Sequence, residues 1–360
     1  MASTEFALGD ALAVQRWSTE LDRETPKKMY FRKFMGASRD NMIVVKSELS
    51  KKAGEKITFG LKMKLSGDGI EDDNIIEGTS AEEAMSFYNQ SLYVSQRRKG
   101  TKSKGRMSEQ RVPYNMRREG RDSLSTWFAE DYDEQIMMFL AGLRGIDSSF
   151  HVGLSWTERA NNSLTAANSA NLIYGGDATS PATLSDADGM ELSIVDRLLA
   201  KIETMDPGIN PFMVDGEKKY VLLMHIWQAY SLRNATSAND WIDVHKNTDG
   251  PKSMIYQNAL GEWNGMILHK HRNVIRMDTT ITTYAVDSAR ALCLGAQAGI
   301  IAWGGAGGPG RYTWNEEKDD RGNALAITSG AIYGTQRAIY NSKSFGLIAV
   351  DTYCKDPNTA

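Results

Sequence analysis

The stretch SEQRVPYNMRREGRDSLSTWFAEDYDEQIMMFLAGL, residues 108–143, carries the longest helical pattern in the chain. Its apolar side chains recur every three or four residues, which is the spacing of one helix face. They are Leu124, Trp127, Phe128, Tyr132, Ile136, Phe139, Leu140 and Leu143. At 1.5 Å per residue, such a helix spans about 54 Å and far exceeds an ordinary globular helix. This pattern predicts a spine against which a sheet or another subunit packs.

Two strands ahead of this helix are predicted to pair as a long hairpin. Residues 57–65, ITFGLKMKL, alternate apolar and polar side chains, as a strand buried on one face does. Residues 87–94 are aromatic or β-branched in character and form the returning strand. A nine-residue strand reaches about 30 Å, so the hairpin is expected to project beyond its own core. Because an isolated hairpin is only marginally stable, it needs another surface to lie on.

Charge is distributed unevenly around this hairpin. Residues 66–85 contain seven carboxylates and no Lys or Arg. Residues 97–121 contain ten basic and two acidic side chains, 10 − 2 = +8. Two opposed blocks of this kind indicate more than a solvated surface, since complementary patches can fix the register of a contact.

Composition excludes several classes of protein. The 360 residues are 41% hydrophobic and 24% charged, with a net charge of −3, which is ordinary for a globular protein. No apolar run approaches the roughly 18 residues of a membrane span, and no secretory signal is evident. Cys293 and Cys354 lack CxxC spacing. A reducing cytoplasm is therefore favoured over a disulfide framework or a thiolate zinc site.

The remaining pattern predicts a central α/β region followed by short strands. Helices are expected at residues 192–205, 227–232 and 289–294, and an amphipathic helical arm at 8–24 that ends at Pro26. Strands are expected at residues 220–225, 265–275, 323–327, 331–340 and 346–351. Residues 160–188 are rich in Asn, Ser, Ala, Thr and Asp and are predicted to be a surface loop.

The run GGAGGPG, residues 304–310, follows an apolar strand as a phosphate-binding loop would. A phosphate loop opens a helix, so that backbone N–H groups converge on the anion. Here Pro309 and Gly310 lead into the β-like residues 311–314, and no Gly-Lys-Ser/Thr ending follows. A flexible connection is therefore favoured over a cofactor site.

His269 and His271 would share one face of a strand, as a metal-binding His-x-His pair does. A third ligand could come from His225, Asp243 or His245. The flanking Lys270 and Arg272 oppose a divalent cation, so histidines on the surface of a strand are favoured. Glu316-Glu317 and Asp319-Asp320 are interpreted as an exposed charge run in a turn. No catalytic motif stands out, and neither an enzyme nor a cofactor is expected.

Four short sequences resemble, in their order and spacing, the major capsid proteins of tailed bacteriophages with the Hong Kong 97 type fold. They are KFMG at 33–36, ALGEWNG at 259–265, LCLGAQA at 292–298 and FGLIAVD at 345–351. They look like a branch of the family found in certain short-tailed phages. The order of predicted elements resembles that family as well.

The resemblance implies an α+β fold of five parts. These are an N-terminal arm, 1–47; the extended loop, 48–104; a peripheral domain with the spine helix, 105–189; an α/β axial domain, 190–285; and a return to the peripheral domain, 286–360. The loop 304–310 would then be a connection that bends differently in pentamers and hexamers.

The function implied by the resemblance is structural. Copies of the chain would assemble as pentamers and hexamers into an icosahedral shell around double-stranded DNA, which they contact without sequence specificity. Assembly in the host bacterial cytoplasm would place the chain in the virion. Fewer than fifty residues precede the extended loop, so a separate scaffolding protein is expected. A portal protein and a cement protein are the other expected partners, and no membrane is expected to take part.

In that fold the extended loop lies over the neighbouring subunit, so its acidic tip is expected to contact the neighbour's basic block. The predicted contact residues are Asp68, Glu71, Asp72, Asp73, Arg97, Arg98, Lys99 and Lys102. The basic block could instead face DNA phosphates, and exposed charges can also be no more than solvated side chains. Alternatives for the whole chain are an encapsulin-like nanocompartment and a metal-dependent hydrolase using His269 and His271.

Overall fold

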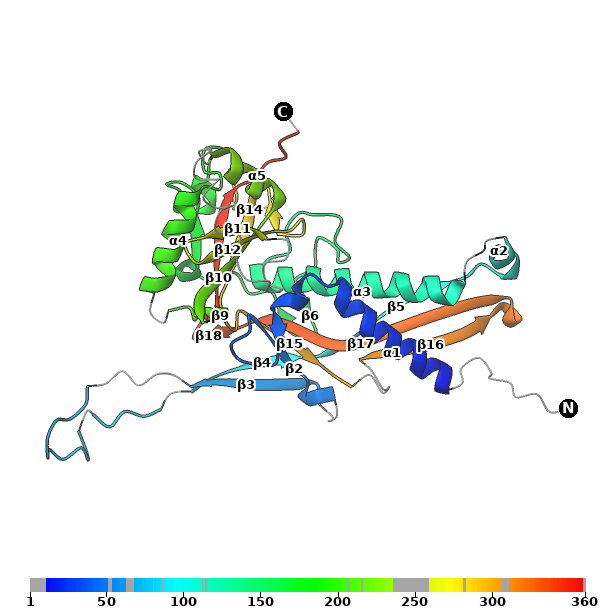
Figure 1. Cartoon of the computed structure of the whole chain (residues 1–360), viewed down its shortest axis with the longest axis horizontal. Coiled ribbons are helices and arrows are strands. Elements are labelled where there is room, and N and C mark those ends of the chain that lie inside the picture. The colour runs from blue at the N-terminus through cyan, green and yellow to red at the C-terminus, as the bar shows by residue number, and fades with distance from the viewer. Residues whose placement is uncertain are drawn as a thin grey trace.

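A long helix lies on one β-sheet and ends against a second (Figure 1). The computed structural model describes residues 11–50, 54–62, 68–79, 81–85, 87–111, 113, 115–205, 208–214, 216–235, 259–280, 283–305 and 311–358. Helices and strands are interspersed along the chain, and each of the two large sheets joins distant segments. The fold is therefore α+β, as predicted. Among the described residues, no helix is long and apolar enough to cross a membrane.

The predicted spine is two helices, α2 (Arg106–Gln110) and α3 (Met116–Ala141). Pro113 lies between them and disfavours helical backbone at the residue before it. Asn115 then caps α3, because its side-chain oxygen accepts hydrogen bonds from the backbone N–H groups of Arg117 and Arg118. At the other end Gly142 has a left-handed φ of 75° and closes the helix. The prediction of a single helix over residues 108–143 was therefore wrong.

The prediction of one apolar face holds only for the first part of α3. Every side chain from Asp131 to Ala141 is buried, polar ones included. The C-terminal half of α3 is therefore a core helix surrounded on all sides, and its buried carboxylates need partners.

The sheet beneath α3 is built on one 14-residue strand, β17 (Ala324–Arg337). One edge of β17 pairs with β16 (Tyr312–Asp319) and then β15 (Gly299–Trp303), and the other edge pairs with β5 (Ser95–Lys102). The sheet continues through β2 (Ile43–Lys46) to β1 (Met35–Gly36). The prediction of two short strands at 323–327 and 331–340 was wrong, because β17 runs through both ranges as one strand. Gly334 interrupts the apolar pattern because a Cβ there would lie 2.0 Å from the Tyr93 carbonyl oxygen.

The second sheet has the strand order β11-β12-β10-β14-β20-β8. Its strands are β11 (Ala259–Trp263), β12 (Met266–Lys270), β10 (Glu217–Met224), β14 (Ser288–Leu294), β20 (Leu347–Tyr353) and β8 (Leu172–Tyr174). The short strands β9 (Phe212–Val214) and β13 (Arg276–Met277) pair with β10 and β14. Helices α4 (Leu192–Thr204) and α5 (Ile226–Ala235) pack against this sheet.

Two sequence predictions fail in this second sheet. The expected helix at 289–294 is the central strand β14, all of whose residues are buried. A short apolar run buried on both faces has no period that distinguishes strand from helix. The expected surface loop 160–188 contains β8, which adds the edge strand to the sheet.

The hairpin forms as predicted from β3 (Lys56–Lys62) and β4 (Phe87–Tyr93), paired from Lys56↔Tyr93 to Lys62↔Phe87. The last predicted residues of the first strand, 63–65, lie outside the described residues. Ile57 and Leu92 bury the root of the hairpin against β2 and β15. Figure 1 shows the rest projecting away from both sheets.

The N-terminal arm is a helix, α1 (Ala11–Lys28), which runs through Pro26 instead of ending there. Arg121 of α3 pairs with Glu20 and Glu24 of α1. The Trp17 ring stacks on Trp314 of β16 at a centroid distance of 6.0 Å. The arm is thus fastened to both the helix and the sheet.

Short elements complete the fold. Among the described residues the 3₁₀ helices are η1 (Phe31–Phe34), η2 (Glu48–Ser50), η3 (Ser169–Asn171), η4 (Pro181–Thr183) and η6 (Asp320–Gly322). Two small hairpins pair β6 (Glu158–Arg159) with β7 (Asn162–Ser163), and β18 (Ile339–Tyr340) with β19 (Lys343–Ser344).

Candidate subunit-contact surfaces

The tip of the β3–β4 hairpin is acidic and apolar at once. The side chains of Asp68, Glu71, Asp72 and Asp73 are all exposed. Beside them Ile75 is 77% exposed, Ile76 54% and Met85 55%. Local hydrogen bonds shape this tip, such as that from the Asn74 amide to the Glu71 carbonyl oxygen at 2.8 Å. Exposed isoleucines on a projecting tip are typical of a surface that is buried by contact with another molecule.

The basic block is divided between two faces of the sheet. Successive side chains of β5 point to opposite faces. Arg97 and Lys99 lie over the Trp127 ring of α3, with cation-to-centroid distances of 5.3 and 5.4 Å. Arg98 and Lys102 therefore point away from α3, and both are exposed. The four predicted basic contact residues do not form one patch.

Arg97 is already engaged within its own chain. Its Nη2 lies 2.7 Å from Oδ1 of Asp131, whose side chain is fully buried. Tyr333 and Gln135 donate hydrogen bonds to the other Asp131 oxygen at 2.6 and 2.9 Å. Arg97 thus neutralises a buried carboxylate, so it is a poor candidate for exchange with a neighbour's acid.

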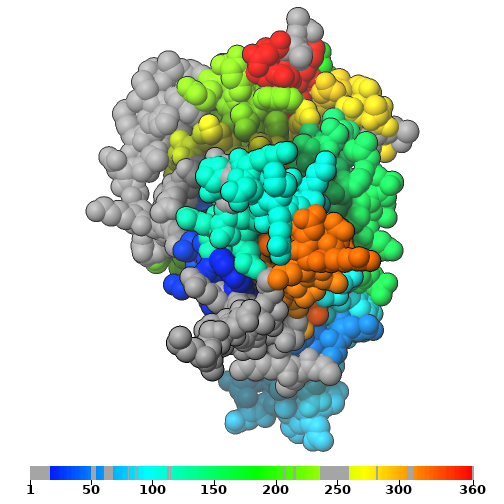
Figure 2. All heavy atoms as spheres, turned by 90° about the vertical axis from the view of Figure 1, so that its right-hand side faces the viewer, coloured from blue at the N-terminus to red at the C-terminus, as the bar shows by residue number. Residues whose placement is uncertain are grey.

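Lys102 pairs with Asp319 of β16 at the edge of the same sheet, where both side chains are more than half exposed. An exposed pair of this kind is weak and can exchange partners. Figure 2 looks onto this end of the molecule, where α2 and the β16–β17 turn stand together and the hairpin tip lies on the far side. The acidic tip and the basic block are therefore at opposite ends of one chain and cannot meet within it.

Part of the charge run at 316–320 is not a turn. Glu316 lies in β16, and its side chain is only 7% exposed, because its carboxylate accepts a hydrogen bond from Arg117 Nε at 2.8 Å. Asp319 and Asp320 do form the predicted turn, with η6.

The histidine pair is not a surface feature. His269 is fully buried, its ring 5.6 Å from that of Phe34, and its Nδ1 lies 3.3 Å from Lys33 Nζ. Burial, with Arg272 and Lys33 nearby, lowers the pKa of His271 to about 4. Within the described part of the chain no three His, Cys, Asp or Glu residues are grouped as metal ligands. Asp243 and His245 lie outside that part.

The two cysteines are separate, free and buried. Burial raises the pKa of Cys293 well above its ordinary value and that of Cys354 to about 12, so both remain thiols. The glycine loop 304–310 lies outside the described residues from 306 onward, so its bending stays a prediction.

Sequence reasoning missed the apolar part of the hairpin tip. The signal was present, since Ile75-Ile76 is an apolar pair within a strongly acidic stretch. The split of the basic block could not be read from the charge count, because it depends on the pairing of β5 with β17.

Comparison with known proteins identifies the family. Residues 5–356 match the family model described as phage capsid protein. The chain is 25% identical to the major capsid protein of Pseudomonas phage KPP25 over 366 residues, with 93% of each protein covered.

Solved structures agree. The capsid of Ralstonia phage GP4 is similar with a TM-score of 0.84 and 36% identity, and 100% of both chains is covered. The capsid asymmetric unit of cyanophage Pam1 has a TM-score of 0.70 over 98% of this chain and 94% of that one. At 17% identity this second likeness shows the fold alone.

These relatives are structural proteins, and nothing among them supports a nanocompartment shell or a hydrolase. The α+β fold and the capsid relatives agree with the Hong Kong 97 type resemblance. The chain therefore belongs to the phage capsid protein family and is a major capsid protein, a structural component of the virion shell.

Proposed function

We propose that copies of this chain form the shell by laying the β3–β4 hairpin over a neighbouring copy. Residues 48–104 are the extended loop, 105–189 the peripheral domain with α3, and 190–285 the axial domain. Residues 1–47 form the arm and 286–360 return to the peripheral domain. Pentamers and hexamers of these copies enclose double-stranded DNA, and scaffolding, portal and cement proteins act as further partners.

One observation carries the proposal, the composition of the projecting tip. Its exposed isoleucines and its carboxylates extend beyond the sheets of their own chain. Apolar side chains in water favour burial, and the row of acids requires that the covering surface be basic. The basic end of a second copy provides such a surface.

The proposed docking face is the side of β5 away from α3. There Arg98 is exposed opposite Gly330, and Lys102 has only a weak exposed pair to give up. On the α3 side, Arg97 is held by Asp131, and Lys99 lies against Trp127. Of the eight predicted contacts, Arg98 and Lys102 are therefore the basic residues proposed to receive the neighbour's tip.

Charge reversal tests this contact. Asp72→Lys with Asp73→Lys places cations at the tip and is expected to impair assembly of DNA-free shells, while the unassembled subunit keeps its melting temperature. Adding Arg98→Glu should partly restore assembly, because the tip again meets opposite charge. Lys99→Glu is the matched control, since it makes the same charge change one residue away on the other face.

Three results would contradict the proposal. Wild-type assembly of the Asp72→Lys, Asp73→Lys variant at low salt, where charge effects are largest, would rule out docking by charge. Equal rescue by Lys99→Glu would remove the assignment of the face. Loss of DNA packaging in shells that still form empty would assign the basic block to the genome.

A further inference from the structure

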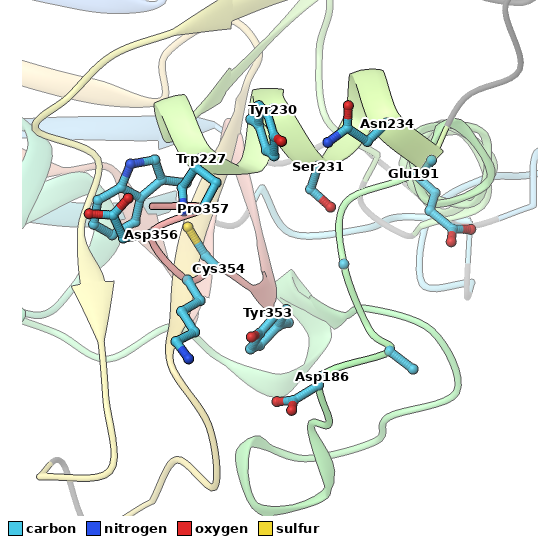
Figure 3. A pocket seen from close by; sticks show the side chains of 14 residues that line it. Asp186, Glu191, Trp227, Tyr230, Ser231, Asn234, Tyr353, Cys354, Asp356 and Pro357 are labelled. Atoms are coloured by element: carbon cyan, nitrogen blue, oxygen red, sulfur yellow. The ribbon is translucent and has the colours of Figure 1, made fainter. Parts of the chain in front are cut away.

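A pocket of about 570 Å³ lies in the second sheet's half of the molecule, apart from the hairpin and the basic block. Its walls include the aromatic residues Trp227, Tyr230 and Tyr353, with Asp186, Glu191 and Asp356 around them. Figure 3 shows Tyr230 from α5 on one side of the space, Tyr353 and Asp186 on the other, and Glu191 at one end.

Strand direction explains why these segments meet. β12 and β10 are parallel, β14 is antiparallel to both β10 and β20, and β8 is parallel to β20. Thus β8, β10, β12 and β20 all end at the same edge of the sheet. The chain leaving β10 enters α5, the chain leaving β20 forms the C-terminal segment, and the chain leaving β8 leads to Asp186 and Glu191. Pockets at the carboxyl ends of strands are common binding sites.

The lining favours a cationic side chain. Tyr and Trp rings present negative faces to Lys and Arg, and carboxylates add opposite charge. Three carboxylates and one cation, Lys355, line the pocket, and Asp186 and Glu191 form no ion pair with any described residue. Tyr230 is 50% exposed and Ile226, which also lies on α5, 44%, so an apolar surface adjoins the pocket. Exposed aromatic side chains beside polar groups are typical of protein interfaces.

The complementary charge lies on the same edge of the sheet, at the end of β12. Lys270 and Arg272 are exposed there, and neither has a carboxylate partner among the residues described. β12 is three strands from β20, about 14 Å at 4.7–4.9 Å per spacing. Although β12 lies beside β10, which leads into α5, neither cation is among the residues that line the pocket of its own chain. They can occupy an equivalent pocket in another copy.

We propose that the aromatic and acidic pocket of one copy receives Lys270 and Arg272 of a second copy. The two surfaces are different patches of one chain, so the contact is head-to-tail, and repetition about an axis closes a ring. This inference rests on the proposed assembly into pentamers and hexamers, and it assigns the side chains that join copies within each ring.

Reciprocal charge reversal tests the contact. Asp186→Lys with Glu191→Lys is expected to reduce assembled material about tenfold, and Lys270→Glu with Arg272→Glu should do the same. Combining all four changes should restore most of the loss. Sedimentation velocity separates subunits, rings and shells, and thermal melting of the subunit reports folding. Asp177→Lys with Glu203→Lys is the matched control, since it changes the charge equally at exposed residues outside the pocket.

The pocket contact is overturned if its variants assemble like the control, or if the fourfold variant is no better than either pair. Should the pocket variant fail to fold, the Lys270→Glu, Arg272→Glu variant decides, and its normal assembly would overturn the contact. Normal shells that lose another virion protein would assign the pocket to that protein instead. The hairpin variants fail or succeed separately: normal assembly of Asp72→Lys, Asp73→Lys removes hairpin docking, whatever the pocket variants do.

Discussion

Single buried charges fix how the arm meets the long helix. Asp133 of α3 accepts hydrogen bonds from the backbone N–H groups of Tyr30 and Phe31, at 2.7 and 3.1 Å. Burial raises the pKa of Asp133 to about 7, although these two hydrogen bonds lower it. The residue thus holds the turn between α1 and η1 and is close to its titration point at neutral pH.

This pKa predicts a pH-dependent stability. The folded chain holds the Asp133 proton more tightly than the unfolded chain, in which an Asp pKa is about 3.9. The free energy of unfolding contributed by this group should therefore fall as pH rises from about 4 to about 7, by up to about 1.4 kcal/mol per pH unit. Asp133→Asn should flatten that slope. Urea unfolding of the subunit across this range measures it, and an unchanged slope would assign it to Glu134, whose pKa burial also raises.

At the scale of the element, α3 changes character along its length. Phe128 is fully buried and contacts the rings of Tyr132 and Tyr312. Trp127, one residue earlier, is only half-buried under Arg97 and Lys99. Both side chains were predicted to lie on one apolar face, but only Phe128 is fully buried in the core.

Truncation of these neighbours should therefore give unequal losses. Phe128→Ala is expected to cost about 3–5 kcal/mol, because it removes a filled core position. Trp127→Ala should cost clearly less, about 2 kcal/mol, since part of its surface is already in water. Denaturant unfolding of both subunit variants measures the difference. Equal costs would show that Trp127 is as essential to packing as Phe128.

At the scale of the whole molecule, one buried arginine joins the two halves. Arg290 of β14 makes two hydrogen bonds of 2.7 Å to the carboxylate of Asp351 on β20. Its third nitrogen donates to the carbonyl oxygen of Ala141 at the end of α3, at 2.9 Å. Tyr284 also donates to Asp351, at 2.8 Å. The second sheet is thereby fastened to the end of the long helix.

Removing Arg290 alone should lower the free energy of unfolding strongly, whereas replacing both Arg290 and Asp351 by apolar residues should lower it much less. Arg290→Met leaves the fully buried Asp351 unpaired and is expected to destabilise the subunit by about 3–5 kcal/mol. Arg290→Met with Asp351→Leu should recover much of that loss, because no uncompensated charge remains. A double-mutant cycle measures the coupling. Additive losses would show that the two side chains act independently.

Much of the fold was predictable because its signals are local. The alternation in 57–62 and the aromatic returning strand identified the hairpin. The apolar spacing and the Asp206-Pro207 stop identified α4. β14 and β17 were mispredicted because burial on both faces, and glycines chosen for backbone contact, erase the period that a local reading needs.

The candidate contacts likewise divide into those that local sequence patterns predicted and those that depend on the tertiary structure. Charge blocks and the order of elements are properties of the chain, and they predicted an acidic projecting tip. The resemblance of four short sequences to phage capsid proteins implied a shell protein. Which cations share a face was decided by the register of β5 on β17, and the engagement of Arg97 by the burial of Asp131. The pocket beside Tyr353 arises where three strands far apart in sequence end together. Local patterns record each residue's own preference, whereas proximity between distant segments exists only once the sheets have formed.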